Sequence, residues 1–377
     1  MRFGNDRFGL MSIRVLHCIH SLSGGGAERQ LQMLVAQSKN AGMEPGIFCV
    51  NDKGGELINR SVPIYKSKHS VKYNYSIFSS LHKAMRTFHP DVVHAWLPDS
   101  MTIPAMLVAL MHRVPSVFSY RSTMFFRRPL SVTEYLCALV AASRVVSNNP
   151  VGRSNIAYRF LYKWKRGVEI KNAVDVDARL RKQIAGLNPG SSRSILFAGR
   201  ITAAKNWRCL LQALPLIDTQ HSYRLTICGD GEDAREFREL VDNLKLQDKV
   251  TLLGYRRDIY AIMQSADVLV LPSWYEGMPN VMLEALAIGI PSIVSDIPSH
   301  RDLIGDTQCA MTFNPNSPAE LAARINEFFA DPRRAVQMAR AGWVIAEAYA
   351  PLAMAERYSN FYLDMMAGGS RATTTCN

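Results

Sequence analysis

Short apolar runs rich in β-branched residues alternate with longer stretches of helical pattern along the whole chain. Such runs predict buried parallel strands, and the helical stretches between them predict right-handed crossovers. The chain is therefore expected to be α/β, with doubly wound parallel sheets. The expected strands are Arg14–His20, Gly46–Asn51, Asp91–Leu97, Ser116–Tyr120, Arg144–Ser147, Ser194–Gly199, Arg224–Gly229, Val250–Gly254, Val268–Leu271 and Ser292–Ser295.

These strands form two series, which predict two Rossmann-like domains. A turn-rich stretch, Asn172–Ser192, separates the series. The length of 377 residues also suits two domains. The expected division is residues 1–180, residues 181–350, and residues 351–377, the last comprising a helix (Pro351–Met365) and a polar, disordered tail (Ala367–Asn377).

The net charge of +12 is concentrated in the first half of the chain. Residues 1–180 hold 24 basic and 11 acidic residues, whereas residues 181–377 hold 20 and 21. A basic half suits nucleic acid, an anionic lipid surface or an anionic substrate. No nucleic-acid-binding motif accompanies it, so an anionic membrane is the favoured macromolecular surface and no nucleic-acid partner is expected.

The seven cysteines have no metal-ligand spacing, which predicts reduced, buried thiols in a cytoplasmic protein. The first ten residues lack an apolar signal core, and the longest apolar stretch, Met101–Met111, is too short to cross a bilayer. The protein is expected to be soluble or bound peripherally to the inner face of the cytoplasmic membrane.

Two glutamates bracket a predicted helix start. Glu276 follows the strand Val268–Leu271, and Glu284 lies within a helix expected to begin at Pro279 and to stop at Gly289. The unpaired N–H groups at a helix start bind phosphate, and carboxylates accept hydrogen bonds from hydroxyls. The pattern fits a nucleotide sugar, whose diphosphate lies between hydroxyl-bearing groups. Solvated surface glutamates are the alternative.

Two cations follow another expected strand. Arg200 and Lys205 come after Ser194–Gly199, in the crevice where open α/β sheets bind ligands. Fixed cations there suit the charge of a departing diphosphate, although solvated surface bases are the alternative. Gly229 ends the next strand and permits a close backbone approach.

Together these segments resemble the retaining GT-B glycosyltransferases of family 4, which use nucleotide-activated sugars. The resemblance is carried by Phe197–Arg200 with Lys205, Cys228–Gly231, Leu253–Gly254, and Ser273–Glu284 with the residues that follow to Asp296. It implies two Rossmann-like domains facing a cleft. It also implies that Glu276 contacts the donor sugar, Glu284 the ribose hydroxyls, and Arg200 and Lys205 the diphosphate, with Gly229 and backbone N–H groups near Asn280 and Val281 completing the donor site.

The first half resembles the family more loosely. Leu22–Arg29 follows the first strand, and the resemblance implies that Gly25 and Gly26 lie beside the donor phosphate and sugar. A dinucleotide-binding loop with Asp52 as its acidic residue is the alternative, but three consecutive glycines do not fit the G-x-G-x-x-G spacing.

Two residues of the first half are candidates for the acceptor or sugar, His94 and Arg121. His94 lies in a segment similar to one in the family that often has a second histidine where Trp96 stands. A core histidine with satisfied hydrogen bonds is therefore an equally good interpretation of His94.

Neither a metal nor another cofactor is expected. Asp175 and Asp177 match the metal-binding Asp-x-Asp of a different glycosyltransferase fold, but their place in the interdomain connection indicates a coincidence. Two basic-aromatic stretches, Tyr120–Arg128 and Arg159–Arg166, suit phospholipid headgroups. Helix ends with a solvated charged face are the alternative.

The expected reaction is transfer of a hexose or N-acetylhexosamine, with retained configuration, from a UDP- or GDP-sugar. The expected acceptor is a glycan or lipid-linked glycan in cell-surface polysaccharide biosynthesis. A sugar-nucleotide epimerase or glycogen-type phosphorylase of the same fold, and a non-catalytic carbohydrate-binding protein, are the alternatives.

Overall fold

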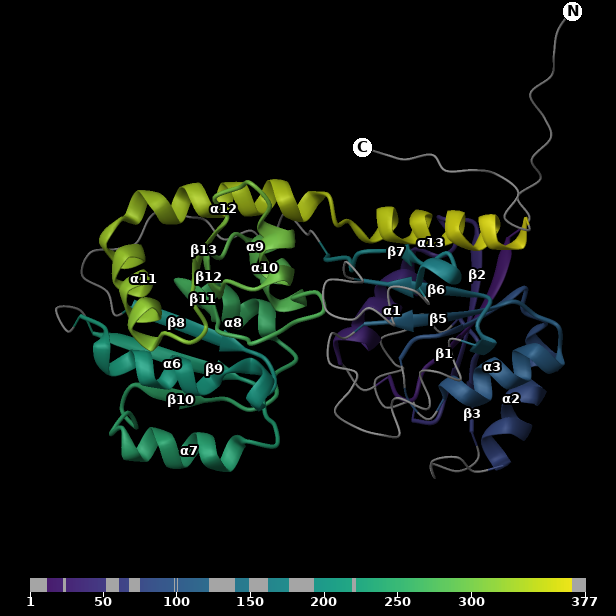
Figure 1. The fold of residues 1–377 in the computed structure, drawn as a ribbon, viewed down its shortest axis with the longest axis horizontal. Helices are drawn as coiled ribbons and strands as arrows, with labels where there is room; N and C mark the ends of the chain where they lie inside the picture. The colour runs from purple at the N-terminus through teal and green to yellow at the C-terminus, as the bar shows by residue number, and fades with distance from the viewer. Residues whose placement is uncertain are drawn as a thin grey trace, which may run out of the picture. The chain divides into compact units, whose positions relative to one another are not determined.

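The protein is described by a computed structural model that divides into two units (Figure 1). Unit 1 comprises Met1–Ala173 and Pro351–Asn377, and unit 2 comprises Val174–Ala350. The second unit thus begins a few residues before the boundary expected at residue 181. The structure describes residues 12–22, 25–51, 61–67, 75–97, 99, 101–121, 140–148, 162–175, 193–218 and 222–367. The tail beyond Ala367 and most of the stretch between the domains lie outside these residues.

Unit 1 contains a parallel sheet with the strand order β3-β2-β1-β4-β5-β6-β7. Alternate strand residues pack against opposite helix layers, α2 and α3 on one face and α1 and α13 on the other. The strands are β1 (Ile13–Cys18), β2 (Met43–Cys49), β3 (Ile64–Lys66), β4 (Val92–Ala95), β5 (Ser116–Tyr120), β6 (Arg144–Ser147) and β7 (Val168–Glu169). The helices are α1 (Gly26–Gln37), α2 (Tyr75–Phe88), α3 (Thr102–Met111) and α13 (Pro351–Met366).

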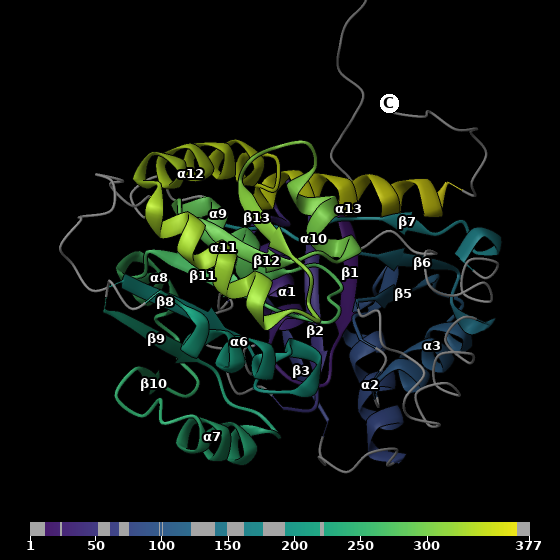
Figure 2. The ribbon, with the colours of Figure 1, turned by 60° about the vertical axis from the view of Figure 1, so that its left-hand side comes forward.

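Unit 2 contains a second parallel sheet with the order β10-β9-β8-β11-β12-β13. Its strands are β8 (Arg193–Ala198), β9 (Tyr223–Cys228), β10 (Val250–Leu252), β11 (Val268–Leu271), β12 (Ser292–Ser295) and β13 (Ala310–Phe313). One face packs against α6 (Trp207–Ala213), α7 (Ala234–Asn243) and α11 (Pro318–Ala330), of which α6 and α11 lie toward the viewer in Figure 2. The other packs against α8 (Ile259–Ser265), α9 (Asn280–Ile288) and α10 (Pro298–Ile304), and α12 (Pro332–Glu347) contributes to both layers. The predicted architecture of two doubly wound, Rossmann-like domains is confirmed. No helix in the described ranges is long and apolar enough to cross a bilayer.

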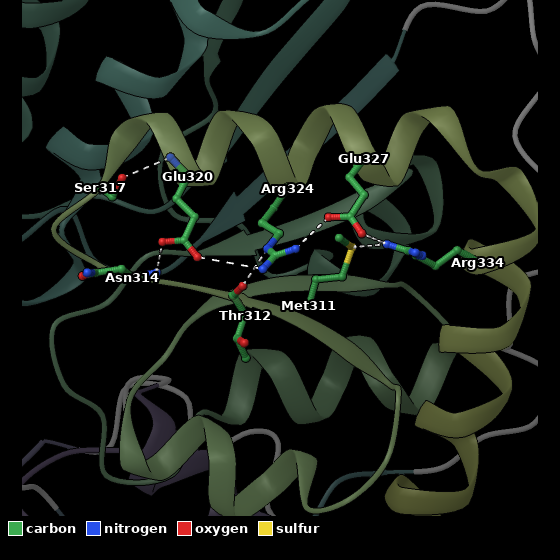
Figure 3. Close-up of polar contacts among 8 residues, drawn as sticks. All are labelled: Met311, Thr312, Asn314, Ser317, Glu320, Arg324, Glu327 and Arg334. Carbon is green, nitrogen blue, oxygen red and sulfur yellow. Dashed lines mark hydrogen bonds and ion pairs between the residues drawn. The ribbon is translucent and has the colours of Figure 1, made fainter.

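A polar network ties α11 and α12 to the edge strand β13 (Figure 3). The Arg324 guanidinium donates to the Thr312 carbonyl oxygen (3.1 Å) and to Glu327 (2.8 Å). Arg334 of α12 forms an ion pair with the same Glu327 carboxylate. These side chains are 35–39% exposed, so each pair alone contributes little. Together, however, these contacts connect both helices to β13. Glu327 binds Arg334 of α12 and Arg324 of α11, and Arg324 also bonds to Thr312 of β13.

The loops after β8 and β9 pack tightly against each other at the carboxyl edge of the second sheet. Gly229 has a φ of +154°, and a Cβ atom added there would lie 1.8 Å from the Gly199 carbonyl oxygen. A Cβ at Gly231 would lie 2.2 Å from the Ile201 carbonyl oxygen. Because both obstacles are backbone atoms, neither clash is relieved by a rotamer change. These glycines therefore fix the path of the loop that carries Arg200.

Replacing Gly229 by alanine is expected to destabilise unit 2 by about 3 kcal/mol, because the loop after β8 would have to move as well. The measurement is the free energy of unfolding in urea. Gly254→Ala is the matched control, since Gly254 also has a positive φ (+66°) but its Cβ would meet nothing within 4 Å. The control should lose only about 1 kcal/mol. Equal losses in the two variants would contradict the tight loop contact.

Candidate active site

The carboxyl ends of the parallel strands of unit 2 lie at one edge of its sheet, and the predicted donor residues follow three of them, β8, β9 and β11. Arg200 follows β8 and is exposed, and within the described residues its side chain forms no hydrogen bond or ion pair. Gly229 follows β9, and its backbone lies so close to the Gly199 carbonyl oxygen that no side chain fits between them. The loop after β8 thus presents a cation whose side chain can adapt to a ligand.

The loops after β8 and β11 are joined by their backbones. The Trp274 N–H donates to the Ala204 carbonyl oxygen (2.9 Å). Asn206 adopts a left-handed conformation (φ +50°), and its side-chain amide donates to the Pro315 carbonyl oxygen (2.9 Å). These contacts fix the short 3₁₀ turn Ala203–Lys205 beside the loop that contains Glu276.

The Lys205 ammonium and the Glu276 carboxylate form an ion pair. The side chains are only 21% and 13% exposed, and the Ser273 hydroxyl donates to the same Glu276 Oε1 atom (2.8 Å). Burial raises the pKa of the Glu276 carboxyl, but the charge of Lys205 and the hydrogen bonds from Lys205 and Ser273 outweigh it and hold the pKa below its usual value. Glu276 is therefore ionised at neutral pH, when it accepts hydrogen bonds and has no proton to give.

Helix α9 begins at Asn280, with Pro279 as its N-cap and not as its first helical residue. It ends as predicted at Gly289, which has a φ of +81°. Glu284 is the fifth helical residue and is 4% exposed. The Asn280 N–H donates to the Met278 carbonyl oxygen (3.0 Å), so a phosphate bound there would have to displace this contact.

Gly25 and Gly26 lie at the start of α1 in unit 1, as N-cap and first helical residue. A Cβ at Gly25 would lie 2.3 Å from Glu28 Oε2, so the Glu28 carboxylate covers Gly25. A carboxylate at this position is favoured by the helix dipole, and it would have to move before a phosphate approached Gly25. The sequence analysis missed Glu28, although an acidic residue three positions after an N-cap is a common feature of helix starts.

His94 is a core residue in which both ring nitrogens have partners. Nδ1 lies 2.7 Å from the Tyr362 hydroxyl and Nε2 lies 2.6 Å from the Ser119 hydroxyl. The side chain is fully buried, and burial holds its pKa well below the usual value. Trp96, at the place of the family's second histidine, donates to His17 Nδ1 (3.0 Å). These contacts favour the core interpretation of His94 over sugar binding.

Arg121 is held by unit 1 itself. Its guanidinium donates to Asn172 Oδ1 (3.0 Å) and to the Tyr358 hydroxyl (2.7 Å), and it lies 4.1 Å from the centre of the Trp96 ring. A role in acceptor binding stays a prediction. The rest of its basic-aromatic stretch, residues 122–128, lies outside the described residues, as do residues 159–161 of the second stretch.

The described residues contain no group of three His, Cys, Asp or Glu side chains arranged to hold a metal ion. Asp177 of the Asp-x-Asp sequence lies outside them. The charged residues predicted for the donor site of unit 2 are thus Arg200, Lys205 and Glu276, together with the buried Glu284.

Curated relatives are glycosyltransferases that are identical to this chain at about a quarter of the matched positions. MJ1607 of Methanocaldococcus jannaschii, an uncharacterized glycosyltransferase, is 26% identical over 223 residues, and the match spans 59% of this chain and 54% of that protein. The lipopolysaccharide core biosynthesis glycosyltransferase LpsD of Rhizobium meliloti is 25% identical over 333 residues, 85% of this chain and 89% of LpsD. A diphospho-undecaprenol 4-alpha-N-acetylgalactosaminyltransferase of Campylobacter jejuni is 26% identical over 310 residues, 77% of this chain and 83% of that enzyme.

Among solved structures, Anabaena HepE in complex with UDP-glucose has a TM-score of 0.75 at 18% identity, over 93% of this chain and 99% of HepE. Two family models match adjoining parts of the sequence. Glycosyltransferase Family 4 matches residues 24–178, and Glycosyl transferases group 1 matches residues 180–343. The matches together span most of both units, and the chain belongs to the family 4 glycosyltransferases of the GT-B fold.

Proposed function

We propose that the protein transfers a hexose or N-acetylhexosamine, with retained configuration, from a nucleoside diphosphate sugar to a glycan or lipid-linked glycan of a cell-surface polysaccharide. The observation that carries this proposal is the Lys205–Glu276 pair beside the exposed Arg200 at one sheet edge. LpsD and the Campylobacter enzyme, named for lipopolysaccharide core and diphospho-undecaprenol substrates, support this class of acceptor. Retention is carried over from the family.

The donor diphosphate is assigned to Arg200 and Lys205. An ammonium group has three N–H donors, so Lys205 can bond Glu276 and still donate to a phosphate oxygen. Arg200 adds a planar donor group that matches phosphate geometry. Two permanent cations stabilise the charge that develops on the leaving diphosphate, and the proposed reaction is therefore metal-independent.

The sugar and the ribose are assigned to the two glutamates. Ionised Glu276 accepts hydrogen bonds from sugar hydroxyls, and Glu284 accepts them from the ribose. Uridine is the first base to test, because HepE, the structural neighbour with a TM-score of 0.75, is in complex with UDP-glucose.

We also propose that unit 1 binds an anionic membrane at the amino ends of β5, β6 and β7. A cavity of about 480 Å³ lies there, lined by Pro115, Ser143, Arg144, Trp164, Lys165, Arg166 and Met365. Trp164 is 59% exposed, and Met111, at the end of the helix that leads into β5, is 72% exposed. Lys163 is exposed beside them. Exposed apolar side chains among cations suit a headgroup layer, where each cation contributes about 1 kcal/mol.

Arg200→Ala and Lys205→Ala are each expected to lower kcat by about two to three orders of magnitude, because each removes a cation from the leaving diphosphate. The measurement is nucleoside diphosphate release in the presence of EDTA. Arg208→Ala is the control, since Arg208 pairs with Glu236 on the protein surface. Near-normal rates in the two test variants, or a requirement for Mg²⁺ or Mn²⁺ in the wild type, would argue against this assignment.

If uridine is the base of the donor, UDP should raise the melting temperature more than GDP or ADP. The ligand that the folded state binds most tightly stabilises it most. Glu284→Gln removes a charged acceptor and should weaken UDP binding about tenfold, as expected for a charge-assisted hydrogen bond. Thermal shift and calorimetry measure the two effects. Unchanged UDP affinity in the variant would remove Glu284 from the ribose site.

Trp164→Ala combined with Lys163→Glu is expected to abolish binding to vesicles of anionic phospholipid, because it removes the exposed ring and reverses a charge. Vesicle sedimentation at low salt measures this. Tyr255→Ala is the control, since Tyr255 is 62% exposed in unit 2. The membrane proposal fails if the wild-type protein does not sediment with the vesicles.

A further inference from the structure

A buried histidine lies behind the donor-site loop. His300 is in the first turn of α10 and has no exposed surface. Its Nδ1 atom lies 2.8 Å from the Ser295 carbonyl oxygen, and because a carbonyl only accepts, Nδ1 must carry the proton. Burial lowers the pKa of His300, so the ring is neutral and Nε2 has a lone pair. Nε2 is buried and has no hydrogen-bond partner among the residues that the structure describes.

Hydrogen bonds connect His300 to Glu276 through two serines. The Ser295 hydroxyl donates to the Ser273 carbonyl oxygen (2.5 Å), which joins the ends of β12 and β11. The Ser273 hydroxyl donates to Glu276 Oε1 (2.8 Å). His300, Ser295 and Ser273 are all fully buried, so these contacts are shielded from water. The position of the Glu276 carboxylate thus depends on residues of α10 and β12 as well as on Lys205.

The stability of the fold does not account for a histidine at this position. A buried acceptor without a partner costs about 1–3 kcal/mol, which an apolar side chain of similar size would avoid. The Ser295 carbonyl oxygen also accepts from the Ile297 N–H (2.9 Å), so it would keep a partner without His300.

The charged groups around His300 show why a neutral donor suits the position. Glu276, Lys205 and Asp296 all act on the His300 ring electrostatically, and Asp296 is paired with Arg301. A permanent cation in place of His300 would compete with Lys205 for the Glu276 carboxylate. A neutral Nδ1–H orders the Ser295 backbone without disturbing the Lys205–Glu276 pair.

We propose that His300 is a positioning residue for the transfer reaction, holding Ser295 and, through Ser295 and Ser273, the Glu276 carboxylate against the donor sugar. The inference rests on the proposed function, because it gives Glu276 the sugar as its ligand. His300 itself touches no substrate, because its side chain has no exposed surface.

The test compares His300→Leu with His300→Asn. Asparagine places an amide N–H where Nδ1–H lies, whereas leucine fills the space without a donor. His300→Leu should lower kcat about 10- to 100-fold, as small misplacements of reacting groups do, with UDP affinity unchanged and stability in urea unchanged or raised. His300→Asn should restore most of kcat. Wild-type kcat in the leucine variant, or equal losses in both variants, would overturn the proposal.

Two further measurements keep the outcome decisive. If His300→Leu does not fold, Ser295→Ala replaces it, since it breaks the bond to the Ser273 carbonyl and should lower kcat similarly; normal kcat in that variant would count against the proposal. If the wild type releases no nucleoside diphosphate from any UDP-, GDP- or ADP-sugar with any acceptor, the proposed function fails by itself. The inference is then tested by binding alone. The wild type should bind UDP-glucose more tightly than UDP, and His300→Leu should lose that difference in affinity. A difference retained in His300→Leu would overturn the inference.

Discussion

The contact between the loops after β8 and β11 is the constraint on which the proposed donor site depends. It joins Lys205 to Glu276, which are 71 positions apart in sequence, and the Trp274–Ala204 backbone bond holds it in place. Transferring two charges from water to a mostly buried site is costly, and good geometry and additional hydrogen bonds must offset the cost. The Ser273 hydroxyl supplies such a bond. Removing either charge would leave the other poorly compensated, so the two loops are ordered together.

The fully buried strands could be predicted from sequence because their signal is local. β11 is a continuous apolar run, β12 has two β-branched residues between two serines, and the predicted bounds of both strands agree with the structure. β3, β7 and β13 were missed because they are two to four residues long, mostly half-exposed, and lie at sheet edges. Glu28 had a local signal, its place three positions after the N-cap, but its position over Gly25 is seen only in the structure. The role of His300 could not be predicted, because it arises from its contact with Ser295 and from the bond of Ser295 to Ser273.

Unit 1 shows how buried polar residues can serve packing. The guanidinium of Arg121 lies beside His17 and His94, and burial together with this charge lowers the pKa of His17 to about 3. Both histidines are therefore neutral and serve as hydrogen-bonding groups of the core. Tyr358 and Tyr362 of α13 bond to Arg121 and His94, which attaches this helix to the first sheet. His94 and Arg121 thus hold a distant part of the sequence in unit 1.

In the proposed reaction, the Lys205–Glu276 pair also links recognition of the sugar to stabilisation of the leaving group. Before a donor binds, Glu276 largely neutralises Lys205, so the exposed Arg200 and the start of α9 supply most of the attraction for a diphosphate. When a sugar hydroxyl donates to Glu276, the carboxylate shares its charge between that hydroxyl and Lys205. The ammonium can then donate more strongly to the phosphate. A site built in this way stabilises a departing diphosphate best when the sugar is correctly seated, which favours transfer over loss of the donor.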